Sequence, residues 1–199
     1  LILPVYNDWE SLKLLLGKVE KILKKRDYEF QVLIVNDNSS KINKKTLNQN
    51  KFFKSIKSIN LKVNIGSQKA IATGIKYIAK NPQKFGKDFI IMDSDGEDDY
   101  TKINKILDYT KKNKKISVVT VNRSSRKDSL IFKFLYEIHL ILTFFLTFKY
   151  IRYGNYSYLN YRALKFISNK KELWLAYSAS IEKNFQNKKS IIAARKKRF

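Results

Sequence analysis

Short apolar runs alternate with stretches of helical period along the first 125 residues. Runs typical of buried strands cover 1–5, 30–35, 55–61, 88–92 and 116–121. Apolar residues at helical spacing predict helices over 12–23, from 64–66 onward, and over 100–112. Strands that alternate with helices predict an α/β fold, with a doubly wound, mostly parallel sheet flanked by helices. No repeat or low-complexity linker interrupts this pattern, so we expect one domain.

The pattern changes after Arg126. Residues 130–148 are almost continuously apolar and aromatic, with Lys133, Glu137 and His139 among them. A transmembrane helix needs about 20 apolar residues, so these polar side chains favour an amphipathic helix lying on a membrane, or a core helix. His139 is interpreted as a core or interface residue.

Two parts of one domain are therefore expected, a core over 1–126 and a helical, membrane-proximal part over 127–199. The chain opens inside a strand and closes in basic residues, which predicts truncation at the C-terminus.

Basic residues dominate the composition. The chain holds 41 Lys and Arg against 17 Asp and Glu, a formal net charge of +24, and it has no Cys. Such a charge attracts nucleic acid, anionic lipid or phosphorylated substrates. No nucleic-acid motif accompanies it, so nucleic acid is not expected as a partner. Zero Cys excludes disulfides, thiolate metal sites and a Cys nucleophile.

Five acidic residues oppose this bias directly after the run at 88–92. They are Asp93, Asp95, Glu97, Asp98 and Asp99. Carboxylates at i and i+2 can share one hard cation and leave sites for phosphate oxygens, and Mg²⁺ or Mn²⁺ suits an all-oxygen site. In open α/β sheets the ligand crevice lies outside the carboxyl ends of the strands. The alternative is a solvated acidic turn in which Asp98 or Asp99 caps a helix.

A second carboxylate, Asp37, follows the run at 30–35 in the same way. It is expected either to bind a ligand at the strand end or to hold its own loop in an Asx-turn. Asn7 or Asp8 is expected to cap the first helix.

Four segments, in this order, resemble motifs of family 2 glycosyltransferases. They are Leu3-Pro4-Val5-Tyr6-Asn7-Asp8 for PxYNE, Val35-Asn36-Asp37-Asn38-Ser39 for VDDxS, Asn64-Ile65-Gly66 with Ala70 and Gly74 for NxGxxxAxxxG, and Asp93-Ser94-Asp95 for DxD. The resemblance covers about the first 125 residues. It implies a GT-A fold, an inverting reaction and a nucleotide-sugar donor, which is a UDP-, GDP- or dTDP-sugar.

The later chain looks like the polyprenyl-phosphate group of that family, which includes dolichol-phosphate mannose synthase. The segments are 93–99 for DADLQDPPE, 121–126 for GxRxxR, 153–159 with Arg162 for GxFRLxxR, and 192–198 for RxxR. Asp8 stands where Glu is usual, Glu97 replaces Gln, Asp99-Tyr100 replaces Pro-Pro, and Ser157 replaces the Arg of FRL. The last departure removes a cation expected near the acceptor phosphate.

Roles for individual residues follow from the resemblance and from charge. Asp95, with Asp93 and Glu97, is expected to hold a divalent ion that neutralises the leaving diphosphate. The expected donor-binding residues are Pro4, Tyr6, Asp8, Asp37, Gly66, Lys69, Asp93 and Ser94. Arg123 and Arg126 are expected to bind the acceptor phosphate and count with Asp95 as catalytic.

The class of acceptor is inferred from the residues that could act as a general base. After Asp128 the acids are Glu137, Glu172 and Glu182, with no Glu-Asp pair. A hydroxyl acceptor needs a base, whereas a phosphate monoester, with a second pKa of about 6, does not. We therefore expect a polyprenyl-phosphate acceptor at the cytoplasmic face of the membrane, and the sequence leaves a homo-oligomer open.

Three alternatives remain. One is transfer to a saccharide hydroxyl in cell-envelope polysaccharide synthesis, and a second is a basic nucleic-acid-binding domain. The third is a non-catalytic homologue, against which the presence of Asp37, Asp93 and Asp95 argues.

Overall fold

A computed structural model describes residues 1–41, 52–124 and 153–199. Its strands are β1 (Ile2–Val5), β2 (Gln31–Asn36), β3 (Ser55–Asn60), β4 (Asp88–Ile91), β5 (Val118–Arg123), β6 (Tyr153–Asn160) and β7 (Lys189–Ala193). Its α-helices are α1 (Trp9–Leu23), α3 (Ser67–Lys80), α4 (Lys102–Lys112), α6 (Tyr161–Ser168) and α7 (Tyr177–Asn184). Two short 3₁₀ helices, η1 (Pro82–Lys84) and η2 (Lys171–Trp174), complete the described elements.

The seven described strands form one sheet in the order β3-β2-β1-β4-β6-β5-β7. β6 pairs antiparallel with both β4 and β5, and the other pairs are parallel. The prediction of a mostly parallel, helix-flanked sheet is therefore confirmed for the described residues.

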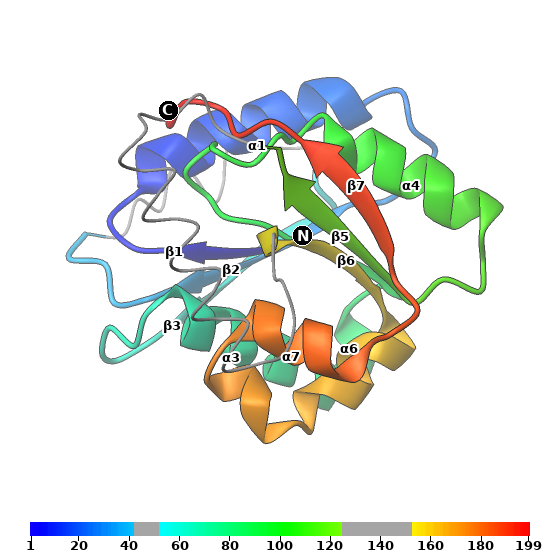
Figure 1. Cartoon of the computed structure of the whole chain (residues 1–199). Helices are drawn as coiled ribbons and strands as arrows, with labels where there is room; N and C mark the ends of the chain where they lie inside the picture. Colours follow the sequence, from blue (N-terminus) through cyan, green and yellow to red (C-terminus); the bar gives the residue numbers. More distant parts are fainter. Residues whose placement is uncertain (42–51, 125–152) are drawn as a thin grey trace, which may run out of the picture.

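Helices cover both faces of this sheet (Figure 1). On one face α1 and α4 bury apolar residues such as Leu12, Leu16 and Ile106 against the sheet. On the other face α3, α6 and α7 bury Ile71, Ile167 and others. These are the apolar positions at helical spacing, so each helix presents its apolar stripe to the sheet.

The small residues of α3 let it lie close to the sheet. A Cβ atom on Gly74 would stand 3.0 Å from side-chain carbons of Ile2 and Val35, tighter than ordinary van der Waals contact. Gly74 therefore allows α3 to approach β1 and β2 closely.

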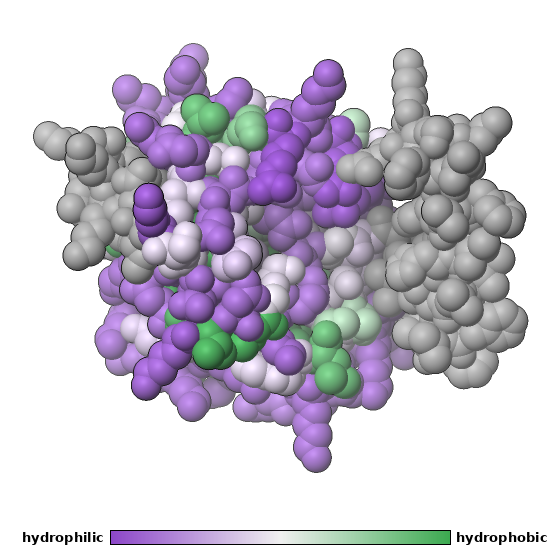
Figure 2. Space-filling view, turned by 90° about the vertical axis from the view of Figure 1, so that its left-hand side faces the viewer, coloured by the Kyte–Doolittle hydropathy of each residue, from purple (hydrophilic) through white to green (hydrophobic). Residues whose placement is uncertain are grey.

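The carboxyl ends of β1, β2 and β4 meet at one edge of the sheet. Val5 lies opposite Asn36, and Ser94, three residues after the end of β4, lies beside Pro4 of β1. Figure 2 views the molecule from the left-hand side of Figure 1, toward which β1 points, and shows a mostly hydrophilic surface with small separate hydrophobic areas.

Two strands were not predicted. The expectation of a helical part over 127–199 misses β6 in the middle of the sheet and β7 at its edge. The sequence of β6 is YGNYSYLN and that of β7 is KSIIA, so neither shows the long apolar run of a buried strand. The predicted amphipathic helix over 130–148, with Glu137 and His139, lies outside the described residues, as does Arg126. Of the helices in the described part, none is long and apolar enough to span a bilayer.

Candidate functional site

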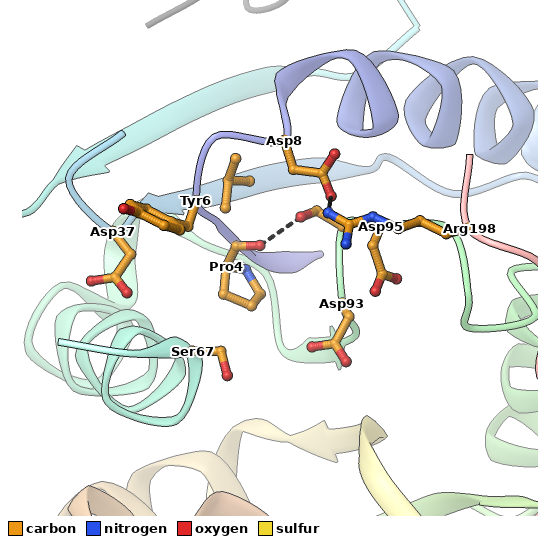
Figure 3. Close-up of a pocket in the computed structure, with 10 residues that line it drawn as sticks. Pro4, Tyr6, Asp8, Asp37, Ser67, Asp93, Asp95 and Arg198 are labelled. Carbon is orange, nitrogen blue, oxygen red and sulfur yellow. Dashed lines mark hydrogen bonds and ion pairs between the residues drawn. The ribbon is translucent and has the colours of Figure 1, made fainter. Parts of the chain in front are cut away.

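A cavity of about 230 Å³ opens at the edge where β1, β2 and β4 end. Its lining residues are Pro4, Val5, Tyr6, Asp8, Asp37, Ser67, Asp93, Ser94, Asp95 and Arg198. Figure 3 shows Asp37 and Tyr6 on one side of the cavity, Asp93 and Asp95 on the other, and Pro4 between them. Carboxylates from the ends of two strands therefore line one cavity.

Asp37, at the end of β2, holds the start of α3. Its two carboxylate oxygens accept hydrogen bonds from the backbone N–H groups of Ile65 and Gly66, both at 2.8 Å. Gly66 has a φ of +85°, a conformation that glycine adopts without strain. Asp37 is 2% exposed. Its carboxylate therefore fixes the loop before Ser67, which brings Ser67 to the cavity.

Asp93, at the end of β4, is held by a side chain from β6. Its Oδ1 accepts a hydrogen bond from Asn155 Nδ2 at 2.8 Å. Arg123 Nη2 lies 3.8 Å from the other oxygen, Oδ2. Burial raises the pKa of Asp93, and the hydrogen bond from Asn155 opposes that rise. The carboxylate is thus oriented by a neutral donor and only loosely balanced by a cation.

Hydrogen bonds also fix Ser94 and Asp95, the next two residues that line the cavity. Ser94 donates a buried hydrogen bond to the carbonyl of Pro4 at 2.7 Å, which links the acidic turn to β1. Asp95 Oδ1 accepts from the backbone N–H of Glu97 at 3.0 Å. Burial raises the pKa of Asp95, against the nearby Arg195 and Arg198.

Asp98 lies beneath this turn and is 5% exposed. Its Oδ2 accepts from the backbone N–H of Asp93 at 3.0 Å, and its Oδ1 is 3.7 Å from Arg123. Burial and the neighbouring charge of Asp93 raise the pKa of Asp98 to about 7. Three of the five acids therefore carry raised pKa values, as expected where like charges are crowded away from water.

The Arg123 guanidinium lies beside Asp93 and Asp98 and also contacts β6 at Gly154. A Cβ atom on Gly154 would stand 2.8 Å from the Arg123 guanidinium, so the absence of a side chain at 154 leaves room for that group. Arg123 was predicted to bind the acceptor phosphate; in the structure it lies beside Asp93 and Asp98 and is not among the lining residues of the cavity.

The residues after β7 cross the acidic turn. Arg195 forms an ion pair with Glu97, Lys196 Nζ lies 2.8 Å from Asp99, and the backbone N–H of Phe199 donates to the Asp95 carbonyl. Arg198 donates to Asp8 at 2.7 Å, a contact drawn in Figure 3. Basic residues from the end of the chain thus neutralise acids from its first and middle thirds.

The expected helix caps are not formed as predicted. Asp8 occupies the N-cap position of α1 without a side-chain cap hydrogen bond, because its carboxylate pairs with Arg198. Asn7 instead accepts from the N–H and hydroxyl of Ser40, which fixes the loop after β2. Asp99 accepts from Thr101, the N-cap residue of α4.

Two carboxylates of the cavity suit a divalent ion. Asp93 and Asp95 both line it, and both are partly removed from water, a cost that a bound cation offsets. Among residues 1–41, 52–124 and 153–199, no three acidic or His side chains converge closely enough to hold an ion by themselves. The donor set therefore fits an ion that takes its remaining oxygens from a bound ligand.

Seven of the predicted site residues line the cavity, namely Pro4, Tyr6, Asp8, Asp37, Asp93, Ser94 and Asp95. Gly66 supports it through Asp37, whereas Lys69 and Glu97 are not among the lining residues and Glu97 pairs with Arg195. Arg126 lies outside the described residues.

Sequence reasoning did not single out Val5, Ser67 and Arg198 as lining residues, nor Gln68 and Asn155 behind them. Ser67 follows the Gly of the NxG segment and Val5 lies within the first motif, so those two had a local signal. The other three reach the site through long-range contacts.

Comparison with known proteins gives a family and a fold. The model of the family "Glycosyl transferase family 2" matches residues 1–170. None of the curated proteins matches the chain in sequence.

Several solved structures are similar. TarS 1–349 from S. aureus is 16% identical with a TM-score of 0.59, and the match covers 97% of this chain and 59% of that one. The mannosyltransferase PcManGT from Pyrobaculum calidifontis, solved with GDP-Man and Mn²⁺, is 12% identical with a TM-score of 0.58, covering 97% and 53%.

Mannosyl-3-phosphoglycerate synthase from Rubrobacter xylanophilus is 11% identical with a TM-score of 0.59, covering 100% and 66%. The chain thus spans between 53% and 66% of these three neighbours. At such low identities the likeness shows the fold alone, which is the GT-A fold of glycosyltransferases.

Proposed function

The chain belongs to glycosyl transferase family 2, and on that premise we propose that it transfers a sugar from a nucleotide-sugar donor to a polyprenyl phosphate. The reaction inverts the anomeric carbon: an oxygen of the acceptor phosphate attacks that carbon as its bond to the nucleoside diphosphate breaks.

The donor is proposed to lie across the cavity from the β2 end to the β4 end. Tyr6 is 53% exposed at its mouth, where a base can stack on its ring. Asp37 lies on the same side as Tyr6 and suits the ribose hydroxyls, whereas Asp8 lies toward Asp95 and pairs with Arg198. The sugar and diphosphate then face Asp93 and Asp95, the carboxylates that suit a divalent ion. A neighbour of the same fold, PcManGT, was solved with GDP-Man and Mn²⁺.

Asp93 and Asp95 would hold Mg²⁺ or Mn²⁺ together with diphosphate oxygens. When bound, such an ion neutralises the charge that grows on the leaving diphosphate. The chain's own contribution is to fix the two carboxylates: Asn155 orients Asp93, and the Glu97 N–H orients Asp95. Ser94 anchors the turn to β1.

One observation supports a phosphate as the acceptor: the acidic residues that the structure describes after Asp128 form ion pairs with lysines outside the cavity. Glu172 is paired with Lys183, Glu182 is paired with Lys188 at 3.0 Å, and neither lines the cavity. A hydroxyl acceptor lacks a base among these residues, whereas a phosphate needs only cations. Arg123 lies beside Asp93 and supplies a forked guanidinium suited to phosphate.

We further propose that the acceptor is carried by the membrane and that the enzyme works at its cytoplasmic face. The formal charge of +24 supports attraction to anionic headgroups.

A transfer assay tests the proposal. Purified protein is mixed with UDP-, GDP- and dTDP-sugars, Mn²⁺ or Mg²⁺, and either a short polyprenyl phosphate, the matching polyprenol, or a saccharide. We expect product with the phosphate only, and loss of product in Asp95→Ala. The control is Asp27→Ala, which removes an exposed carboxylate outside the cavity. Product with the saccharide only would replace the proposal by transfer to a hydroxyl.

A further inference from the structure

Three hydrogen bonds connect α7, α3 and β6 to Asp93. The backbone N–H of Tyr177 donates to Gln68 Oε1 at 2.9 Å. Gln68 Nε2 donates to Asn155 Oδ1 at 2.8 Å, and Asn155 Nδ2 donates to Asp93 Oδ1 at 2.8 Å. We call Gln68 and Asn155 the amide relay.

The two ends of the relay fix its direction. A backbone N–H only donates, and an ionised carboxylate only accepts. Gln68 must therefore turn its oxygen toward Tyr177 and its nitrogen toward Asn155, and Asn155 must do the same toward Asp93. Each amide has one allowed orientation, because reversing either would place two donors or two acceptors face to face.

Burial makes this order costly to break. Asn155 is 6% exposed, and Gln68 is partly buried. In such surroundings hydrogen bonds strengthen and an unpaired polar group is penalised. The relay donates a hydrogen bond to Oδ1 of Asp93. The other oxygen, Oδ2, lies 3.8 Å from the Arg123 guanidinium.

We infer that Gln68 and Asn155 are positioning residues that hold the Asp93 carboxylate in the orientation from which Oδ2 can bind a divalent ion. This inference rests on the proposed function, because it assigns Asp93 to the metal of the donor complex. It also makes α7 part of the site's framework, since the relay begins at its first residue.

A competing explanation is that the amides only satisfy buried polar groups. A matched control separates the two. Tyr158 lies on the same strand, three residues from Asn155, is 3% exposed, and donates a hydrogen bond to Asp88 at the amino end of β4. Tyr158→Phe removes this hydrogen bond of β6 and leaves the bonds between Tyr177, Gln68, Asn155 and Asp93 in place.

Binding of Mn²⁺ provides the readout, measured without acceptor so that no turnover occurs. Electron paramagnetic resonance reports free and bound Mn²⁺ in the presence of UDP, GDP or dTDP. The proteins are the wild type, Asn155→Ala, Gln68→Met, Tyr158→Phe and Asp95→Ala, and each is also melted to measure its unfolding temperature.

We expect Asn155→Ala to bind Mn²⁺ with nucleotide about tenfold more weakly than the wild type, since a hydrogen bond to a charged group is lost. Gln68→Met, which leaves Asn155 in place but without its partner, should weaken binding about threefold. Gln68 is only partly buried, so we expect Gln68→Met to fold, and this variant tests the relay even where Asn155→Ala does not fold. Tyr158→Phe should melt earlier but bind Mn²⁺ as the wild type does.

Two results would overturn the inference, and they are distinct. If Asp95→Ala loses Mn²⁺ while Asn155→Ala and Gln68→Met bind normally, the relay does not position Asp93, and the proposed function stands. If the wild type binds no Mn²⁺ with any nucleotide, both the inference and the metal-dependent function are wrong.

Discussion

Asp37 and Asp93 each follow a buried parallel strand and line the same cavity, yet their surroundings differ. Asp37 accepts two backbone N–H groups, from Ile65 and Gly66, and both of its oxygens are engaged. Asp93 accepts one side-chain amide, from Asn155. Asp93 also lies beside the charged side chains of Asp95, Asp98 and Arg123.

The difference shows how one sequence pattern serves two purposes. A carboxylate that accepts backbone N–H groups on both oxygens is a fixed part of a loop, so its removal should lower the stability of the fold. A carboxylate held by a single neutral donor keeps its second oxygen for other contacts, so its removal should weaken the binding of a ligand. The four predictions below separate these two roles.

The largest effect is expected from Asp93→Asn. It removes one of two charges that suit the divalent ion, and we expect transfer to fall at least about a hundredfold. The fold should be retained, because an Asn side chain can still accept from Asn155. Product formation and the unfolding temperature are measured together, and equal activity in the variant would remove Asp93 from the site.

Asp37→Asn is expected to act in the opposite way. An amide can accept from only one of the two backbone N–H groups and turns its own donors toward the other, which should lower the free energy of unfolding by about 2 to 3 kcal/mol. Urea denaturation measures this, with Asp27→Asn as the control. An unchanged midpoint would mean that the bonds to Ile65 and Gly66 do not hold the loop.

A third test exploits the crowding of acids at the β4 end. The folded-state pKa of Asp98 is raised from its usual value of 3.8 to about 7. As pH rises from 4 to 7 the unfolded chain releases this proton while the folded chain keeps it, so stability falls over that window.

Between pH 5 and pH 8, the wild type should therefore lose roughly 2 kcal/mol relative to Asp98→Asn. Denaturation at both pH values gives this difference, and the other titrating groups are common to both proteins. Parallel pH profiles would show that Asp98 does not titrate in this range. The β2 end offers no comparable cluster within the described residues.

The smallest effect is expected from Arg198→Gln. Its guanidinium pairs with Asp8, but its side chain is 61% exposed, so the loss of stability should stay below about 1 kcal/mol. Thermal melts at low and high salt should show the wild-type advantage disappear as salt rises. A loss above that limit that persists in salt would mean that Arg198 contributes through packing.

Most of the sheet could be predicted because its strands carry their own signal. Residues 30–35 and 88–92 are apolar runs bounded by acids, and the structure places strands at both. β6 had no such signal, because the segment Tyr153–Asn160 mixes Tyr, Ser and Asn with one Gly. Its burial comes from insertion between β4 and β5, which no local pattern specifies.

The same limit applies to the site. Asp93 and Asp95 could be predicted because two carboxylates at a strand end have a chemical meaning by themselves. Asn155 and Gln68 could not, because an amide gains its role only from a partner, and these partners lie 62 and 87 positions apart in the chain. Arg198 reaches Asp8 across 190 positions.

The position of β6 also has a consequence for folding. β1, β2, β3 and β4 can pair as soon as they have been synthesised, but the strand that lies beside β4 emerges about sixty residues later. Contacts of such long range are slow to form, because the chain must close a large loop before they stabilise it. Until then the edge of β4 is unpaired and Asp93 lacks Asn155, so a nascent chain acquires the neighbour of β4 and an oriented carboxylate in the same step.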